Sequence, residues 1–353
     1  MNGGPVRVGV VGLGAIGSVH ADTIRRSNAE LVGGADIDAD AREHFKHEHG
    51  VPTYESAEPL YEEADAVVVA VPPRYHEGQT VGAFEAGLDV FLEKPLAHTL
   101  DSAERIAQSA AEHGATCMVG FHDRFVPASR ALARRVEDGE LGEIQHVDAK
   151  YVRRRGVPGP GSWFTSKDVA GGGALQDIGV HAIDMAMHLM GHPSVEEVTG
   201  VARKTFADRE DYVSLIGWDY EAGEGEIDVD DGAIAFFRCA DGGTASVEAA
   251  WAVNRPDAHQ FVVQGTERGA TLDLHEGSLT IHDADSREVG QAIDSDVRAR
   301  GPTKYTASLR HFLDAVREQR APEWNTVEQA LVVQRIVDAI YRADEENFGV
   351  RLG

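Results

Sequence analysis

Residues 171–184 combine a glycine-rich stretch with an acid and a histidine four positions apart. The acid is Asp177 and the histidine is His181, and they begin a segment that is otherwise nearly all apolar and is predicted to be a helix. Side chains at i and i+4 lie one above the other on the same helix face. A buried carboxylate and imidazole are unfavourable unless they are paired. The pattern therefore indicates either a satisfied pair in the core or a site of proton transfer.

A second group of residues is typical of a dinucleotide site. The pattern GxGxxG follows an apolar run predicted to be a strand, and it opens a helical pattern. An acid, Asp36, ends the next predicted strand about 20 residues further on. The glycines permit a tight turn and close approach of a pyrophosphate to a helix N-terminus. We expect the cofactor to contact Gly12, Leu13, Gly14, Ala15, Ile16 and Gly17.

Asp36 favours NAD over NADP as this cofactor. Its carboxylate would accept hydrogen bonds from the ribose hydroxyls of NAD, whereas the 2′-phosphate of NADP would be repelled. The next positions, Ile37 and Asp38, offer no arginine or serine to hold that phosphate. The sequence therefore predicts NAD, with NADP less favoured.

The tripeptide Glu93-Lys94-Pro95 supplies a third reactive group. It ends a predicted strand of a parallel sheet, and ligands of such sheets bind at the carboxyl edge. The Lys94 ammonium could there hydrogen-bond a substrate hydroxyl and stabilise developing alkoxide charge. An ordinary salt bridge to Glu93 is the alternative.

The elements that would position these groups form two blocks. Continuous apolar runs alternate with helical patterns in the first third of the chain, at residues 6–11, 30–36, 66–71, 88–93 and 116–120. Such runs are typical of a parallel sheet covered on both faces. Strands with period-two alternation follow at residues 144–153, 195–204, 232–240, 244–253, 259–265 and 270–275. We predict an α/β protein with a Rossmann domain over residues 1–122 and an α+β domain over 123–353, whose open sheet is mainly antiparallel.

Composition excludes several classes of partner. The chain has 33 basic and 59 acidic residues, a net charge of −26, which argues against nucleic acid and anionic membranes. No apolar run is long enough to cross a bilayer. The two cysteines, Cys117 and Cys239, show no CxxC spacing, and no signal peptide is recognisable. We therefore expect a cytoplasmic protein.

A metal site is not expected. His44, His47 and His49 have a suggestive spacing, but they share a highly charged helical pattern with Glu43 and Glu48. A solvated helix face explains them better.

These motifs together resemble the Gfo/Idh/MocA family of oxidoreductases, the glucose-fructose oxidoreductase and inositol dehydrogenase group. The resemblance runs nearly end to end, through residues 12–17, 72–76, 93–95, 120–125 and 171–184. It implies a Rossmann domain followed by a domain with an open, mainly antiparallel sheet. An open sheet face implies burial in a homodimer or homotetramer.

The resemblance also implies roles for individual residues. Lys94, Asp177 and His181 correspond to the family's catalytic triad, with His181 as base, Asp177 orienting it and Lys94 stabilising the alkoxide. Further contacts with the cofactor are implied for Val71, Pro72, His76, Glu93 and Lys94, and contacts with the substrate for His122, Arg154 and Trp163. Val71 and His122 depart from the family, which usually has a small polar residue and Met or Asn there.

Some of these residues have alternative readings. The arginines at 153–155 could hold a carboxylate or phosphate of the substrate, or pair with the protein's own acids. Trp163 could stack on a sugar or pack in the core. Asp184, three residues after His181, is expected to anchor the helix.

The favoured function is that of an NAD(P)-dependent oxidoreductase acting on CH–OH groups. It would oxidise a secondary hydroxyl of a sugar, cyclitol or related polyol. The alternatives are a glycosidase that retains NAD and a non-catalytic NAD-sensing regulator.

The charge balance predicts that folding depends on salt. Only six of the 33 basic residues are lysines, a composition that resembles proteins of salt-accumulating halophiles. At about 1 M salt the Debye length is roughly 3 Å, so repulsion among the acids is largely screened. We expect the melting temperature to rise from dilute buffer to molar KCl, as followed by circular dichroism. An unchanged melting temperature would contradict this.

Overall fold

The computed structural model describes residues 4–207, 209, 211–215, 225–285 and 290–352. The chain divides into two units, the first running to His122 and including Thr303–Gln334, the second comprising Asp123–Pro302 and Arg335–Gly353. The division after residue 122 coincides with the predicted boundary. Residues 303–334 differ, because the sequence assigned everything after 122 to the second domain. They contain helix α9 (Lys304–Glu318), which packs on the first unit's own elements.

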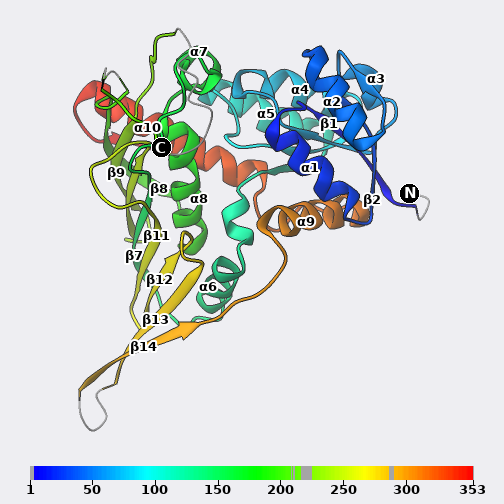
Figure 1. The fold of residues 1–353 in the computed structure, drawn as a ribbon. Helices are drawn as coiled ribbons and strands as arrows, with labels where there is room; N and C mark the ends of the chain where they lie inside the picture. The colour runs from blue at the N-terminus through cyan, green and yellow to red at the C-terminus, as the bar shows by residue number, and fades with distance from the viewer. Residues whose placement is uncertain (1–3, 208, 210, 216–224, 286–289, 353) are drawn as a thin grey trace. The chain divides into compact units, whose positions relative to one another are not determined.

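The first unit, which contains the helices drawn in blue and cyan in Figure 1, is built on a six-stranded parallel sheet in the order β3-β2-β1-β4-β5-β6. Its strands are β1 (Val6–Val11), β2 (Ala29–Ala35), β3 (Thr53–Tyr54), β4 (Ala66–Val69), β5 (Asp89–Leu92) and β6 (Cys117–Val119). The strand order reverses between β1 and β4, which opens a crevice at the carboxyl edge where nucleotides bind in such sheets. The predicted Rossmann architecture is confirmed.

Helices cover this sheet as its apolar strands require. They are α1 (Ala15–Arg25), α2 (Ala39–His49), α3 (Glu58–Tyr61), η1 (Pro73–Tyr75), α4 (His76–Glu85) and α5 (Leu100–His113), together with α9. Every residue of β4 is buried, as expected for a strand covered on both faces. α9 packs against α1, β1 and β5, which explains why this late segment belongs to the first unit.

The second unit contains a nine-stranded sheet in the order β14-β13-β12-β11-β7-β10-β9-β8-β15. Its strands are β7 (Ile144–Val152), β8 (Val195–Arg203), β9 (Gly232–Cys239), β10 (Thr244–Ala250), β11 (Ala258–Gly265), β12 (Gly269–Asp273), β13 (Ser278–Asp285), β14 (Gln291–Val297) and β15 (Val350–Arg351). Among the described strands β7 and β10 pair in parallel and the other neighbours are antiparallel, which confirms the predicted sheet.

Helices pack on this sheet and complete the unit. They are η2 (His122–Phe125), α6 (Pro127–Glu137), η3 (Trp163–Thr165), α7 (Lys167–Ala170), the π-helical turn η4 (Leu175–Gly179) and α8 (Val180–Leu189). The division between the units falls within η2 and again within α10 (Val327–Glu346). α8 packs on β7 and β10, while α6 packs on β12 and β13. No helix in the described ranges combines the length and apolar character that crossing a bilayer requires.

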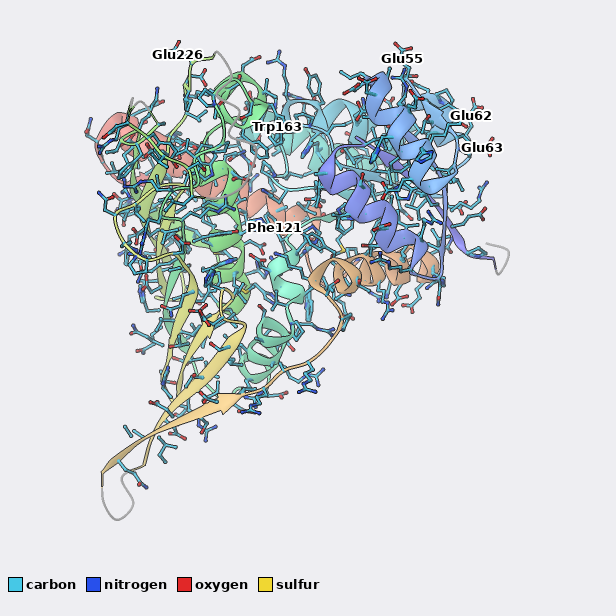
Figure 2. All side chains as sticks on the ribbon, in the orientation of Figure 1. Glu55, Glu62, Glu63, Phe121, Trp163 and Glu226 are labelled. Atoms are coloured by element: carbon cyan, nitrogen blue, oxygen red, sulfur yellow. The ribbon has the colours of Figure 1, made fainter. Side chains whose placement is uncertain are left out.

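Acidic side chains gather on the surface of the first unit around α3. Glu55, Glu62 and Glu63 all project into solvent there (Figure 2). Negative charges on the same surface repel one another, and salt screens this repulsion. Repulsion among such exposed carboxylates is the physical basis of the predicted rise of the melting temperature with salt.

A buried ion pair joins η2 to α8 in the second unit. Arg124 donates from Nε to Asp184 at 2.9 Å and from Nη2 at 2.6 Å, and the two side chains are 0% and 1% exposed. Asp184 thus anchors its helix. Removing one partner of such a pair leaves an uncompensated buried charge.

Asp184→Asn should therefore lower the free energy of unfolding by about 3–5 kcal/mol. The matched control is Glu197→Gln, which removes a surface charge paired with Arg238 in the same unit and should cost about 0–1 kcal/mol. Denaturant titration followed by circular dichroism measures both. Equal losses in the two variants would show that burial does not make the Arg124 pair special.

Candidate active site

Two glycines of the loop after β1 are required by the protein's own packing. Gly12 has φ +92°, and a Cβ there would lie 2.5 Å from the carbonyl oxygen of Ala70. A Cβ on Gly17 would lie 2.0 Å from the carbonyl oxygen of Gly12. A larger residue at position 12 would push the loop away from the main chain at Ala70, and one at position 17 would push α1 away from the loop.

The middle glycine has a different environment. A Cβ on Gly14 would meet nothing within 4 Å, so internal packing does not require a glycine there. α1 starts at Ala15 with no side-chain cap and no acid in its first turn. The N-terminus of α1 thus presents unsatisfied N–H groups beside an open cradle, which fits a pyrophosphate.

Asp36 follows β2 and is oriented by the main chain. Its Oδ2 accepts from the N–H of Leu13 at 2.7 Å and its Oδ1 from the N–H of Asp38 at 2.9 Å. Each carboxylate oxygen can accept a further hydrogen bond, as from a ribose hydroxyl. Arg42 donates to the carbonyls of Asp36 and Ile37, and the side chain of Ile37 is 86% exposed. The acid is therefore held beside the dinucleotide loop.

His76 connects two loops at the same sheet edge. Its Nε2 lies 2.8 Å from the carbonyl oxygen of Val71, and its Nδ1 lies 2.9 Å from that of Pro95. The ring is 1% exposed, and burial lowers the pKa of His76. His76 therefore supports the main chain of both loops, and the cofactor contact expected for it stays a prediction. Val71 and Pro72, by contrast, stay partly exposed after β4.

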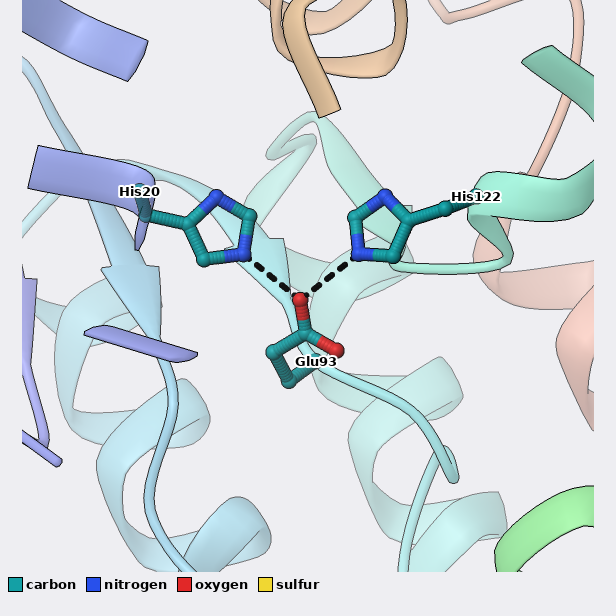
Figure 3. A group of neighbouring side chains, drawn as sticks. All are labelled: His20, Glu93 and His122. Carbon is teal, nitrogen blue, oxygen red and sulfur yellow. Dashed lines mark hydrogen bonds and ion pairs between the residues drawn. The ribbon is translucent and has the colours of Figure 1, made fainter. Parts of the chain in front are cut away.

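Lys94 and Glu93 lie in different environments at the end of β5. Lys94 is partly exposed, whereas Glu93 is buried at 5% exposure. Neighbouring side chains of an extended chain point to opposite sides, so burial of one leaves the other at the edge. Glu93 accepts at a single oxygen, Oε1, from His20 Nε2 at 2.6 Å and from His122 Nε2 at 2.8 Å (Figure 3).

The distances show that hydrogen bonds hold this Glu93 cluster of His20, Glu93 and His122 together. Two histidines and a glutamate are also possible zinc ligands. Around a tetrahedral zinc, however, ligand atoms stand about 3.3 Å apart, since each bond is about 2.0–2.1 Å long. The observed separations are shorter and match N–H···O bonds.

The Glu93 cluster keeps a carboxylate ionised inside the first unit. Burial alone would raise the pKa of Glu93, but the charge and hydrogen bonds contributed by His122 and His20 outweigh it and hold the pKa well below its usual range. Burial lowers the pKa of His122, and the neighbouring Glu93 carboxylate opposes that shift. Gly120 lies close against the carboxylate, since a Cβ there would be 3.0 Å from Oε2.

The substrate contact expected for His122 stays a prediction, and the described structure holds the ring within the first unit. The ring is 4% exposed, its Nε2 faces Glu93, and its Nδ1 lies 2.9 Å from Ser308 Oγ. Tyr305 packs edge-on against it at 4.5 Å. Both ring nitrogens are therefore satisfied within the first unit. The sequence could not reveal this, because Ser308 lies 186 residues away in the chain.

In the second unit, close packing explains the glycine-rich stretch before Asp177. A Cβ on Gly172 would lie 2.1 Å from Tyr341 Oη, and one on Gly173 would lie 1.8 Å from the carbonyl oxygen of Asp230. The carboxylate of Asp230 accepts from the N–H groups of Gly173 and Leu175 and from Tyr341 Oη. Asp230 thus fixes the start of the helical segment that carries the reactive groups. The sequence showed it only as one acid in an acidic stretch.

Asp177 and His181 lie in one continuous helical segment, η4 followed by α8. Asp177 is partly exposed, and its Oδ2 accepts from Trp251 Nε1 at 2.9 Å. His181 is 9% exposed, and its Nδ1 lies 3.7 Å from Asp123 Oδ2. Asp123 was missed in the sequence, although it stands in the 120–125 junction. Lys94 belongs to the first unit, and these two residues belong to the second.

The remaining expected substrate contacts have mixed outcomes. Arg154 is exposed and donates to the carbonyl oxygen of Arg255, so the protein's own main chain uses it. Arg153, its neighbour, instead lines a small pocket together with Asp177. Trp163 is 38% exposed and stacks on Phe164 at 3.7 Å, so one ring face is used internally (Figure 2).

Comparison with known proteins assigns both parts of the chain. Residues 6–121 match the family model described as "Oxidoreductase family, NAD-binding Rossmann fold". Residues 129–271 match the model of the GFO/IDH/MocA C-terminal domain.

Individual relatives cover most of the chain. A candidate UDP-kanosamine synthase oxidoreductase subunit of Amycolatopsis mediterranei is 36% identical over 76% of this chain and 75% of that protein. The D-glucoside 3-dehydrogenase of Escherichia coli is 29% identical over 100% of this chain and 99% of its own. A solved levoglucosan dehydrogenase in complex with NADH has the same fold, with a TM-score of 0.87, 22% identity and 99% of both chains covered.

Replacing the acid beside the dinucleotide loop should change cofactor preference. Asp36→Ser combined with Ile37→Arg removes the charge that repels a 2′-phosphate and adds one that attracts it. We expect the ratio of catalytic efficiencies with NAD and NADP to shift toward NADP, measured by initial rates with each. The control is Asp38→Ser, which leaves Asp36 in place. An unchanged ratio in the double variant would refute the role given to Asp36.

Proposed function

This chain belongs to the GFO/IDH/MocA family of NAD-binding oxidoreductases, and from that premise we propose that it oxidises a secondary hydroxyl of a sugar or related polyol. NAD is the hydride acceptor. The residues assigned to the reaction are Lys94, Asp177 and His181.

The placement of Lys94 is the observation that carries the proposal. It follows β5, whose neighbour β4 borders the β1/β4 crevice, so its side chain stands at the same sheet edge as the dinucleotide loop. A cation at that edge lowers the energy of an alkoxide formed next to the nicotinamide. The buried Glu93 cluster fixes the strand end from the other side.

The oxidation requires the removal of a proton and a hydride. When held by the loop at residues 12–17 and by Asp36, NAD⁺ would supply the acceptor for the hydride that leaves the substrate carbon with its electron pair. We assign the hydroxyl proton to Nε2 of His181, because Nδ1 faces Asp123. As the O–H and C–H bonds break, the carbonyl C=O forms, and Lys94 stabilises the negative charge on its oxygen.

Asp177 receives a different role from the one expected from the sequence. Trp251 Nε1 holds one of its oxygens, and the side chain is partly exposed beside Arg153. We assign it to a second hydroxyl of the substrate. Asp177 would then hold a hydroxyl next to the one from which His181 takes the proton.

The D-glucoside 3-dehydrogenase of Escherichia coli is similar to this chain over its whole length, so glycosides are the first substrates to test. The experiment is NADH formation from NAD⁺ in multimolar KCl at mildly alkaline pH, with glucosides, aldoses, inositols, sugar acids and sugar phosphates. Turnover of one class supports the proposal. Tight NAD binding with no net NADH from any class would contradict it and favour the NAD-retaining glycosidase or the regulator.

We also propose that a second copy of the chain covers the outer face of the nine-stranded sheet. Val201, Ile234 and Phe236 are 59%, 50% and 41% exposed, and Val201 pairs in register with Ile234. An exposed apolar row on a sheet is typical of an interface. Sedimentation equilibrium should give a dimer or tetramer that Ile234→Glu dissociates and the control Ile37→Glu does not. A monomeric wild type would contradict this.

The expected compartment remains the cytoplasm. Cys117 and Cys239 are free and buried, as in proteins kept under reducing conditions. Fractionation of native cells would test it, and recovery with the secreted fraction would contradict it.

Removing the proposed base should abolish most turnover. His181→Ala should lower kcat on the order of 10²–10⁴-fold, since nothing else is assigned to take the hydroxyl proton. NADH binding, measured by fluorescence titration, should stay unchanged. The matched control is His275→Ala, an exposed histidine of the same unit. Near-wild-type turnover of His181→Ala would remove it from this role.

A further inference from the structure

Two histidines of the second unit share one carboxylate oxygen. Asp123 Oδ2 lies 3.7 Å from His181 Nδ1 and 3.1 Å from His259 Nε2. The three side chains come from η2, α8 and β11, which are far apart in the sequence. Asp123 is 2% and His181 9% exposed, so solvent screens this charge poorly.

The position of His259 is set by strand pairing. β11 pairs with β7 so that His259 stands opposite Tyr151, and the two rings stack at 3.8 Å with an interplanar angle of 14°. The stack holds the imidazole with its Nε2 toward Asp123. Since the side chain of His259 is only 13% exposed, it competes with His181 for this carboxylate largely out of contact with water.

We propose that Asp123 is the positioning residue for His181. His259 shares the Asp123 carboxylate and thereby adjusts how strongly His181 binds a proton. This inference rests on the proposed function, in which His181 takes the substrate proton. Neither Asp123 nor His259 contacts substrate in this scheme; both act through His181.

The chemistry follows from which ring nitrogen faces the acid. A carboxylate beside Nδ1 favours the tautomer that carries its proton there, which leaves the lone pair on Nε2 to receive the substrate proton. It also stabilises the imidazolium that forms. The 3.7 Å separation is longer than a hydrogen bond, and catalytic hydrogen bonds commonly tighten only when substrate binds.

The other charges around His181 have partners of their own. Arg124 of η2 is paired with Asp184 of α8. Asp177 of η4 accepts from Trp251. On β7, the ring of Tyr151 lies 6.2 Å from the His181 ring, and Arg153 donates to Tyr151 Oη.

Substitutions of Asp123 and of His259 should shift the pH dependence of kcat in opposite directions. Asp123→Asn removes the negative charge, so the His181 imidazolium loses its stabilisation. The rising limb of kcat should move to lower pH, and kcat should fall at least about tenfold. His259→Phe keeps a ring to stack on Tyr151 but removes the competing nitrogen. The carboxylate then acts fully on His181, and the limb should move to higher pH.

The experiment measures kcat and KM against pH for NADH formation, with NADH binding and melting temperature recorded for each variant. His259→Gln, which restores a donor to the carboxylate, should return the limb toward the wild-type position. KM and NADH binding should stay within about threefold, because neither residue touches substrate or cofactor in this scheme.

The outcomes distinguish a failure of the positioning role of Asp123 from a failure of His181 as the base. Opposite shifts of the limb support the proposal. If the variants lose stability and activity while the rising limb of kcat stays at the wild-type pH, Asp123 and His259 have structural roles only. That result would overturn the proposal. If His181→Ala retains wild-type turnover, the assignment of the base fails, and this proposal fails with it. If His181→Ala is inactive while Asp123→Asn leaves the limb unmoved, only the positioning role fails.

Discussion

A carboxylate removed from water needs donors or an opposite charge around it, and this constraint organises both units. Glu93 obtains two imidazole N–H groups within the first unit. Asp184 obtains a guanidinium, Asp230 obtains backbone N–H groups and a phenol, and Asp123 obtains two imidazoles. Glu93 lies at the end of β5, Asp230 holds the start of the helical segment that carries Asp177, and Asp184 anchors the helix of His181. In a chain with a net charge of −26, these are among the acids that the fold has to accommodate inside.

The junction after β6 is distinctive because consecutive residues make their contacts within different units. His122 supports Glu93, next to which Lys94 emerges at the cofactor edge. Asp123, the following residue, lies beside His181 in the second unit. Arg124 then anchors the helix of His181 through Asp184. One short segment therefore holds side chains that act within each of the two units, which gives a physical reason for a histidine, an acid and an arginine in succession.

Local patterns in the sequence were enough to predict the glycine turn after β1, an acid at the end of the next strand and most strands, because glycine spacing and apolar periodicity act over short distances. The π-helical turn at Asp177 and the partners of His122 were out of reach, since they depend on residues such as Ser308 that the fold brings together. β14 (Gln291–Val297) was missed because nearly every residue in it is exposed, so no apolar alternation marks it. Residues 303–334 were assigned to the wrong side of the boundary for a similar reason: which core a late helix joins is decided by packing.

The central claim is that this chain moves a hydride from a sugar carbon to NAD. Its most direct test uses a D-glucoside deuterated at the ring carbon to be oxidised, incubated with the enzyme and NAD⁺ in multimolar KCl, with the cofactor recovered for mass spectrometry. The account predicts one deuterium per NADH formed, together with a keto sugar in equal amount. Deuterium that stays on the sugar, or that returns to it while the cofactor is recovered as NAD⁺, would contradict a net dehydrogenase.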